Sequence, residues 1–262
     1  MKKLAVIISS ILLSSAATAA DSYQSVSNVG YKNTDSNDTL SIDSTYYLSP
    51  KRTLGPYDQF TYINKQSNVY GRYADDDFGD VTAIGGEYFI NNFVVGASYN
   101  NVDYGSSSKN YTLSGGYFLT SDLLAKVTFI ENRDGEDSAL FDLAYNHRLN
   151  STDYVGVTLT SDDDFDYRAV AAKYFIDLQQ GNYLTFEGKY ESYDNAENQW
   201  VAETNYYFSK ATSVFANYNK QDTYSFGGQH FINRNIGVKV GYENNADNSD
   251  YDAYFANVRF QF

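Results

Sequence analysis

The stretch GGEYFINN, residues 85–92, decides the fold because related stretches return along the chain. They are SGGYFLTSD (114–122), AAKYFIDLQ (171–179), ETNYYFSKA (203–211) and GGQHFINRN (227–235), with weaker members STYYLSP (44–50), AYNHRLNSTD (144–153) and NVRFQF (257–262). They recur about every 29 residues, the length that two strands of roughly ten residues, a tight turn and a loop require. We therefore expect each repeat to be a β-hairpin, and about sixteen strands in all.

Between the repeats, apolar and polar side chains alternate with a period of two. In residues 236–243, for example, Ile236, Val238, Val240 and Tyr242 alternate with Gly237, Lys239, Gly241 and Glu243. This period is typical of strands whose two faces meet different surroundings. The sequence thus predicts an all-β chain with one domain over residues 20–262.

The connections between the expected strands are of two kinds. Each Tyr-Phe element is followed by a short turn such as Asn91-Asn92 or Asn233-Arg234-Asn235. The opposite ends of the hairpins carry acidic loops: DDDFGD (75–80), NRDGED (132–137), SDDDFD (161–166), SYDNAEN (192–198) and NNADNSD (244–250). Short turns at one end, larger loops at the other and aromatic residues at an interface are typical of a transmembrane barrel. We expect a closed, antiparallel, up-and-down transmembrane β-barrel rather than a soluble sandwich or β-helix.

The first nineteen residues have the pattern of a signal peptide. Lys2 and Lys3 precede an apolar stretch over residues 4–13, and Ala17-Thr18-Ala19 provides small residues for cleavage. The apolar stretch is shorter than the roughly 20 residues that a membrane-spanning helix needs. We expect residues 1–19 to be removed and the mature protein to be exported.

Composition excludes several classes of function. The 262 residues include no cysteine, which rules out disulfides, zinc–thiolate sites and cysteine nucleophiles. The formal net charge of −14 argues against a nucleic-acid partner, because phosphate binding needs clustered Lys and Arg. The abundance of aromatic residues, 17% of the chain, argues against simple disorder.

The signal sequence, the hairpin repeat and the final strand together resemble the outer-membrane porins of Gram-negative bacteria, most closely the small "putative porin" families with sixteen predicted strands. The final strand alternates through Tyr254, Ala256, Val258 and Phe260 and ends on Phe262. The resemblance implies that Tyr254, Phe260 and Phe262 form the signal read by the barrel-insertion machinery. It also implies contact with outer-membrane lipid and lipopolysaccharide, and a homotrimer. No acidic loop is as long as the pore-constricting loop of the general trimeric porins.

The parity of charged residues within the strands identifies the interior of such a barrel, since charges on the lipid face are costly. The expected pore-lining residues are Asp43, Arg72, Glu87, Lys126, Asp142, Lys173, Glu187, Lys189, Glu203, Lys239, Glu243 and Arg259. Acidic and basic residues are equally numerous in this set, so the lumen should be nearly neutral. A barrel of about sixteen strands is wide enough for water.

The function expected from this barrel is passive diffusion of small hydrophilic solutes and ions. The acidic loops should give a weak preference for cations that salt screens. Two alternatives remain. One is a sugar-selective channel that uses Tyr47, Tyr70, Tyr183 and Tyr207 as a stacking ladder. The other is an occluded barrel with a structural or adhesive role.

Residues 49–66, SPKRTLGPYDQFTYINKQ, form the one irregular insertion and contain both prolines. We favour a long periplasmic turn for this segment over a segment that folds into the pore and narrows it. An enzyme is not expected, because His147 and His230 lie at the Tyr-Phe ends of repeats, where interfacial anchoring is the better interpretation. The runs Asp75–Asp77 and Asp162–Asp164 lack the spacing of a calcium loop of the EF-hand kind, so no metal or cofactor is expected.

Overall fold

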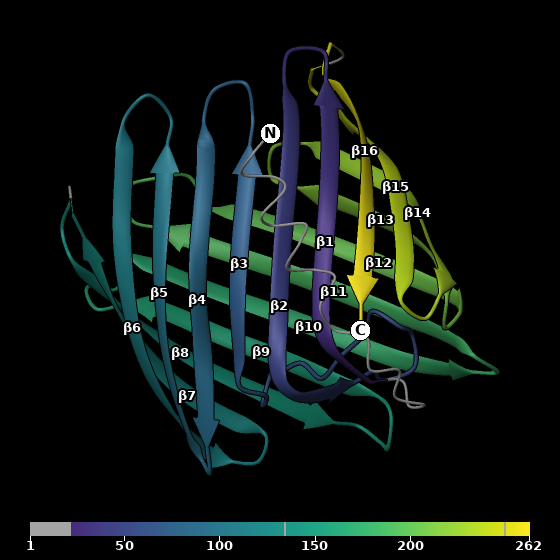
Figure 1. Ribbon diagram of the computed structural model, residues 1–262, viewed down its shortest axis with the longest axis horizontal. Coiled ribbons are helices and arrows are strands. Elements are labelled where there is room, and N and C mark those ends of the chain that lie inside the picture. The colour runs from purple at the N-terminus through teal and green to yellow at the C-terminus, as the bar shows by residue number, and fades with distance from the viewer. Residues whose placement is uncertain (1–21, 134, 249) are drawn as a thin grey trace.

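The computed structural model describes residues 22–133, 135–248 and 250–262, which form sixteen antiparallel strands (Figure 1). The strands are β1 (Ser22–Thr34), β2 (Asp38–Arg52), β3 (Asn68–Asp75), β4 (Asp80–Ile90), β5 (Phe93–Asp103), β6 (Ser107–Thr120), β7 (Leu123–Asn132), β8 (Ser138–Arg148), β9 (Tyr154–Asp162), β10 (Tyr167–Gln179), β11 (Asn182–Tyr193), β12 (Gln199–Ser209), β13 (Thr212–Asn219), β14 (Thr223–Asn233), β15 (Ile236–Asn245) and β16 (Asp252–Gln261). Each strand pairs with its neighbours in sequence, and β1 pairs with β16 to close the barrel. The predicted sixteen-stranded barrel is confirmed. The expected signal peptide, residues 1–19, lies outside the described residues.

The seam between β1 and β16 is sealed by backbone hydrogen bonds. Asn28 pairs with Arg259, and Thr34 pairs with Ala253. At the end of the seam, the N–H of Phe262 donates to the carbonyl of Ser25 at 2.8 Å. Closure gives every strand a neighbour on both sides, so the backbone groups of adjacent strands pair with one another within the sheet. Within the described residues, no helix is long and apolar enough to cross a membrane.

The barrel has a turn end and a loop end. The turn end carries connections as short as Asn91–Asn92 between β4 and β5, where Asn91 adopts the left-handed conformation (φ 53°) that asparagine tolerates. Phe262 lies at this end as well. The loop end carries the acidic connections, such as residues 163–166 between β9 and β10 and residues 194–198 between β11 and β12. This arrangement agrees with the two kinds of connection seen in the sequence.

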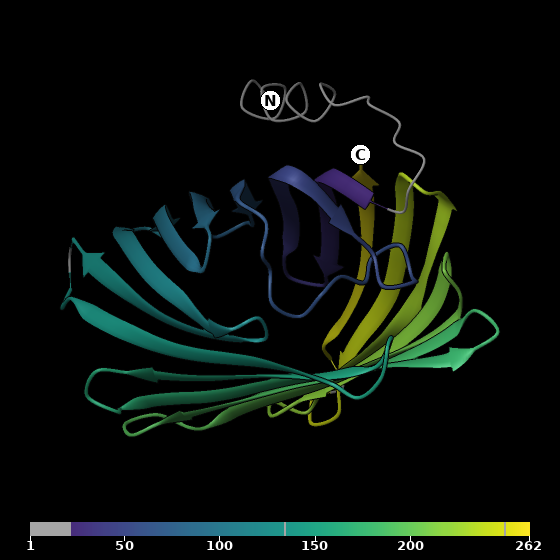
Figure 2. The ribbon, with the colours of Figure 1, turned by 90° about the horizontal axis from the view of Figure 1, so that it is seen from below.

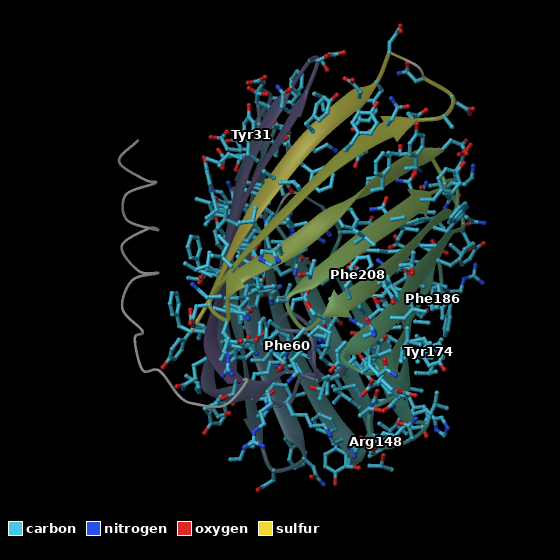
Figure 3. The ribbon with its side chains drawn as sticks, turned by 90° about the vertical axis from the view of Figure 1, so that its right-hand side faces the viewer. Tyr31, Phe60, Arg148, Tyr174, Phe186 and Phe208 are labelled. Atoms are coloured by element: carbon cyan, nitrogen blue, oxygen red, sulfur yellow. The ribbon has the colours of Figure 1, made fainter. Side chains whose placement is uncertain are left out.

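Aromatic side chains on the outer face lie near both ends of the barrel, not only near the turns as the repeat suggested. Trp200 and Tyr218 form a pair near the loop end with ring centroids 5.6 Å apart, and Tyr242 and Tyr254 form another at 5.2 Å. Figure 3 shows Tyr174, Phe186 and Phe208 projecting from the outer face of neighbouring strands. The exposed aromatics near the turn end include Tyr88, Phe93, Tyr117, Tyr145 and Phe208. Two such belts match the two interfaces of a membrane.

The irregular insertion between β2 and β3 lies inside the barrel (Figure 2). Strand β2 continues through Arg52, so the irregular part is residues 53–67, here called the inner segment. It hydrogen-bonds to Thr158 on β9, Lys173 on β10 and Gln229 on β14, partners that only an interior segment can share. The favoured interpretation of a long periplasmic turn is therefore wrong. The segment lies inside the barrel because its amide and phenol groups form hydrogen bonds with polar side chains of the inner wall.

Candidate channel lumen

The strand register places the charged residues expected in the pore on one face of the sheet. Glu187 on β11 lies directly opposite Lys173 on β10 and, on its other side, directly opposite Glu203 on β12. The inner segment contacts this face through Lys173, so it is the interior. Because strand side chains alternate between faces, the register assigns the same face to the rest of the set: Asp43, Arg72, Glu87, Lys126, Asp142, Lys189, Lys239, Glu243 and Arg259.

Several of these charges are neutralised by neighbours on the inner wall. Lys173 Nζ lies 2.8 Å from Glu187 Oε1, and Lys126 Nζ lies 3.6 Å from Glu87 Oε1. Towards the loop end, Lys32 pairs with Glu243 at 2.6 Å and Lys189 pairs with Glu191 at 2.7 Å. Lys32 and Glu191 were absent from the expected set, although they share the inward parity of Asn28 and Glu187. They lie near strand ends, where the alternation of side chains is a weaker guide to whether a residue lies within the lumen.

The inner segment is held by an amide that bridges two strands. Gln59 Nε2 donates to the Tyr207 hydroxyl at 2.5 Å, while Lys173 Nζ donates to Gln59 Oε1 at 2.7 Å. Beside it, Gln229 Nε2 donates to Asp58 Oδ2 at 2.8 Å. Gln59 is only 7% exposed. These bonds fasten the middle of the segment to the wall formed by β10, β12 and β14.

A second set of contacts holds the following residues against β9. The Tyr62 hydroxyl lies 2.8 Å from Thr158 Oγ1, and its ring covers Gly156. A Cβ atom at Gly156 would lie 2.1 Å from the Tyr62 ring. Tyr62 and Leu54 also pack on a buried aromatic cluster of Tyr154, Phe175, Tyr183 and Tyr207. The absence of a side chain at Gly156 thus makes room for the segment.

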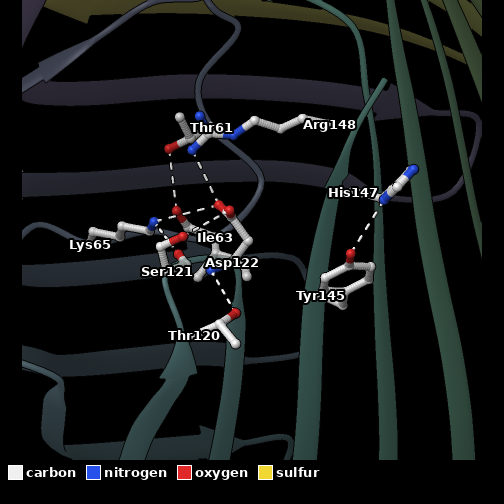
Figure 4. Close-up of polar contacts among 9 residues, drawn as sticks. All are labelled: Thr61, Ile63, Lys65, Thr120, Ser121, Asp122, Tyr145, His147 and Arg148. Atoms are coloured by element: carbon white, nitrogen blue, oxygen red, sulfur yellow. Dashed lines mark hydrogen bonds and ion pairs between the residues drawn. The ribbon is translucent and has the colours of Figure 1, made fainter. Parts of the chain in front are cut away.

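At the turn end, Lys65 and Arg148 share one carboxylate (Figure 4). Lys65 Nζ lies 3.9 Å and Arg148 Nη2 lies 3.2 Å from Asp122 Oδ1, and Lys65 also donates to the Ser121 carbonyl. Burial raises the pKa of the Asp122 carboxyl, but the Ser121 hydroxyl and the two cations lower it more. The net pKa lies below its ordinary value. Asp122 therefore links the inner segment to the turn between β6 and β7 and to β8.

A polar cavity and a second, more apolar cavity lie beside the inner segment. One, of about 260 Å³, is lined by Asn28, Asp58, Gln59, Glu187, Glu203, Asn205, Tyr207, Gln229, Gly237, Lys239, Asn257 and Arg259. The other, of about 250 Å³, is lined by Tyr62, Ala171, Ala172, Lys173, Glu187, Gly188, Lys189, Val201 and Glu203. Glu187 and Glu203 line both, so the cavities adjoin at these carboxylates. The inner segment therefore occupies part of a lumen whose wall carries these charged residues.

The tyrosines proposed as a sugar-stacking ladder are not all available. Tyr207 is 2% exposed and Tyr183 is 7% exposed, because both lie in the aromatic cluster beneath the inner segment. Tyr47 faces Asn68 on the inner wall, and its ring lies 4.9 Å from Lys51 Nζ. A continuous ladder of these four rings does not form.

The turn end carries a concentration of basic residues that the sequence reasoning missed. They come from strand ends, turns and the inner segment, namely Lys51, Arg52, Lys65, Arg148, Lys210 and Arg234. No single turn looks basic in the sequence, because each contributes one or two of these residues. The barrel thus has an acidic loop end, whereas at the turn end these six basic residues outnumber acidic ones such as Asp122, Asp153 and Asp177.

The two histidines lie on the outer face near the turns. His147 Nδ1 lies 3.2 Å from the Tyr145 hydroxyl, and His230 Nδ1 lies 2.9 Å from Thr212 Oγ1. Within residues 22–133, 135–248 and 250–262, no group of three or more His, Asp or Glu side chains could hold a metal ion.

A closed sixteen-stranded barrel with outward aromatic belts and a polar, charge-lined interior defines a transmembrane porin-type channel protein. The chain belongs to the family described as "Putative general bacterial porin", whose model matches residues 1–262. The resemblance that the sequence suggested is confirmed.

Solved structures show the same fold. The chain is similar to the Acinetobacter baumannii outer membrane protein Omp33, with a TM-score of 0.61 and 19% identity over 92% of this chain and 99% of that one. It is also similar to a triple mutant of the Rhodopseudomonas blastica porin, with a TM-score of 0.53 and 15% identity over 91% of this chain and 98% of that one. No curated protein sequence matches the chain.

Proposed function

We propose that this porin is a narrow diffusion channel of the outer membrane, through which small hydrophilic solutes and ions pass down their gradients. The observation that carries the proposal is the polar cavity of about 260 Å³ that remains between the inner segment and the barrel wall. Its lining of carboxylates, amides and cations can replace part of the hydration of a passing solute. The inner segment limits the width of the path.

We propose a weak preference for cations. The connections at the loop end carry carboxylates such as Asp76, Asp163, Asp194 and Asp247. An acidic mouth raises the local concentration of cations, and salt screens this effect over about 10 Å at 0.1 M. The basic turn end acts in the opposite sense, which is one reason to expect the preference to be weak.

The reversal potential of the reconstituted channel in a KCl gradient tests this preference. At about 0.01 M salt, where the screening length is about 30 Å, the sign of the reversal potential should show cation preference. At about 1 M salt, the size of the reversal potential should fall close to zero. Substituting Asp163, Asp164 and Asp166 with asparagine should reduce the preference at low salt. Equal or anion-favouring permeability at low salt would contradict the proposal.

We also propose the route by which the protein reaches its site. Residues 1–19 act as a cleaved signal peptide, and the barrel-insertion machinery reads Tyr254, Phe260 and Phe262. The position of these three residues on or at the end of β16 supports this role. Lipopolysaccharide is expected around the loop end, and a homotrimer is the expected assembly.

An occluded barrel with a structural role is the second candidate, and the inner segment is the observation that favours it. The two candidates differ in conductance, since an occluded barrel would insert into bilayers without carrying appreciable current.

A further inference from the structure

The cavity of about 260 Å³ contains charges of both signs that do not neutralise one another. Glu203 comes from β12, whereas Lys239 and Arg259 come from β15 and β16. In the part of the chain that the structure describes, none of these three side chains forms an ion pair. This sets them apart from Lys173, Lys126 and Lys32, each of which pairs with a carboxylate on the inner wall.

Neutral neighbours hold the three charged groups in place. Lys239 Nζ lies 3.8 Å from the centre of the Phe215 ring, and Arg259 Nε donates to Gln261 Oε1 at 3.0 Å. On β12, which lines the same cavity, Asn205 Nδ2 donates to Glu203 Oε1 at 2.8 Å. These contacts fix the positions of the charges without cancelling them. A solute that carries groups of both signs can therefore form charge-assisted hydrogen bonds with these partly exposed side chains.

The acidic wall carries a further sign that a cationic group is missing. Glu203 lies directly opposite Glu187 on the neighbouring strand, an arrangement that is destabilising for like charges. Lys173 neutralises Glu187, but no cation neutralises Glu203 in the described part of the barrel. Asp58, which lines the same cavity, has a buried Oδ1 atom without a hydrogen-bond partner. Both carboxylates can therefore accept hydrogen bonds from an ammonium group.

We propose that this cavity is a binding site for a small zwitterion of the α-amino acid class on its way through the channel. The ammonium group of the solute is bound by Glu203 and Asp58, and its carboxylate is bound by Lys239 and Arg259. The inference rests on the proposed channel function and adds the class of solute to it. A volume of about 260 Å³ lies just below the roughly 300–1,000 Å³ of pockets for drug-sized ligands, as suits a smaller molecule. A neutral sugar would leave every one of these charges unpaired.

Uptake of four solutes of nearly equal size into vesicles that contain the full chain tests the proposal. They are alanine, a zwitterion; lactate, an anion; alaninamide, a cation at about pH 6 because its amine has a pKa near 8; and lactamide, which is neutral. Alanine should enter fastest at low concentration, and its uptake should saturate. If lactamide enters as fast as alanine and neither saturates, the channel function stands and the zwitterion site is wrong. If no solute enters, both the channel function and the site are wrong.

Single substitutions locate the site. Glu203→Gln and Lys239→Gln should each raise the half-saturating alanine concentration by about fivefold to tenfold, as expected for loss of one hydrogen bond to a charged group in a wet site. Lactamide uptake should not change. Glu197→Gln, the same chemical change in the loop between β11 and β12, is the matched control and should leave alanine uptake unaltered. An equal effect of all three substitutions on alanine would contradict the assignment, and circular dichroism verifies that each barrel has folded.

Discussion

Gly156 on β9 shows how a single position controls the place of the inner segment, because the Tyr62 ring occupies the space that a side chain would need. Gly156→Ala should displace Tyr62 and break its hydrogen bond to Thr158, at a cost of roughly 1 kcal/mol. The freed segment should be cleaved faster by trypsin after Lys65, and the channel should conduct more current. Gly188→Ala on β11 is the control, since a Cβ atom there would meet its nearest neighbour at an ordinary 3.5 Å. Equal trypsin sensitivity of both variants would contradict this account.

The contact between Lys65 of the inner segment and Asp122 should depend on pH. The pKa of this carboxyl is lowered in the folded protein, so its contribution to stability is present above the unfolded pKa of about 3.9 and is lost as the pH falls through the folded value. Because Arg148 and Lys65 are largely exposed, Asp122→Asn should lower the free energy of unfolding at pH 7 by less than about 1 kcal/mol. Urea unfolding at pH 7 and about pH 3 measures this difference, which should be smaller at the lower pH. A difference that does not decrease between the two pH values would mean that the effect is not electrostatic.

At the scale of the strand, alternation separates a lipid face from a lumen face, and neighbouring residues should respond very differently to the same charge. Val127 and Thr128 lie in the middle of β7, with Val127 pointing outward and Thr128 inward. Val127→Arg should reduce the free energy of unfolding from vesicles by about 2–4 kcal/mol, the cost of a cation near the bilayer midplane. Thr128→Arg should be nearly neutral. Similar losses for both variants would contradict the assignment of the two faces.

The same alternation explains which elements the sequence could predict. The Tyr-Phe repeat and the period of two are local patterns, so they gave the number of strands and the two kinds of connection. The position of residues 53–67 depends on pairs distant in sequence, such as Gln59 with Tyr207 and Asp58 with Gln229. Glutamine, aspartate and tyrosine are ordinary in loops, and nothing in their spacing points to partners on β12 or β14. The basic turn end escaped prediction for a related reason, since its charges gather only when the barrel closes.

For the whole molecule, sixteen strands enclose a lumen that the inner segment partly fills, so the width and the charge of the lumen are set by different parts of the chain. Strands around the whole barrel contribute charged residues to its inner wall, and the inner segment lies beside the part that includes β10, β11, β12, β15 and β16. Strand parity is the basis for the predicted charged lining, whereas the position of the inner segment is seen only in the three-dimensional structure.

Single-channel conductance in a planar bilayer, measured for the intact chain and for a variant with a shortened inner segment, tests the central claim most directly. In the variant, a Gly-Ser linker just long enough to join Arg52 to Asn68 replaces the residues between them. The account predicts a small, steady conductance for the intact barrel and a several-fold larger one for the variant, with the same sign of ion selectivity. An intact barrel that inserts but carries no current, or a variant that conducts no better than the intact chain, would contradict it.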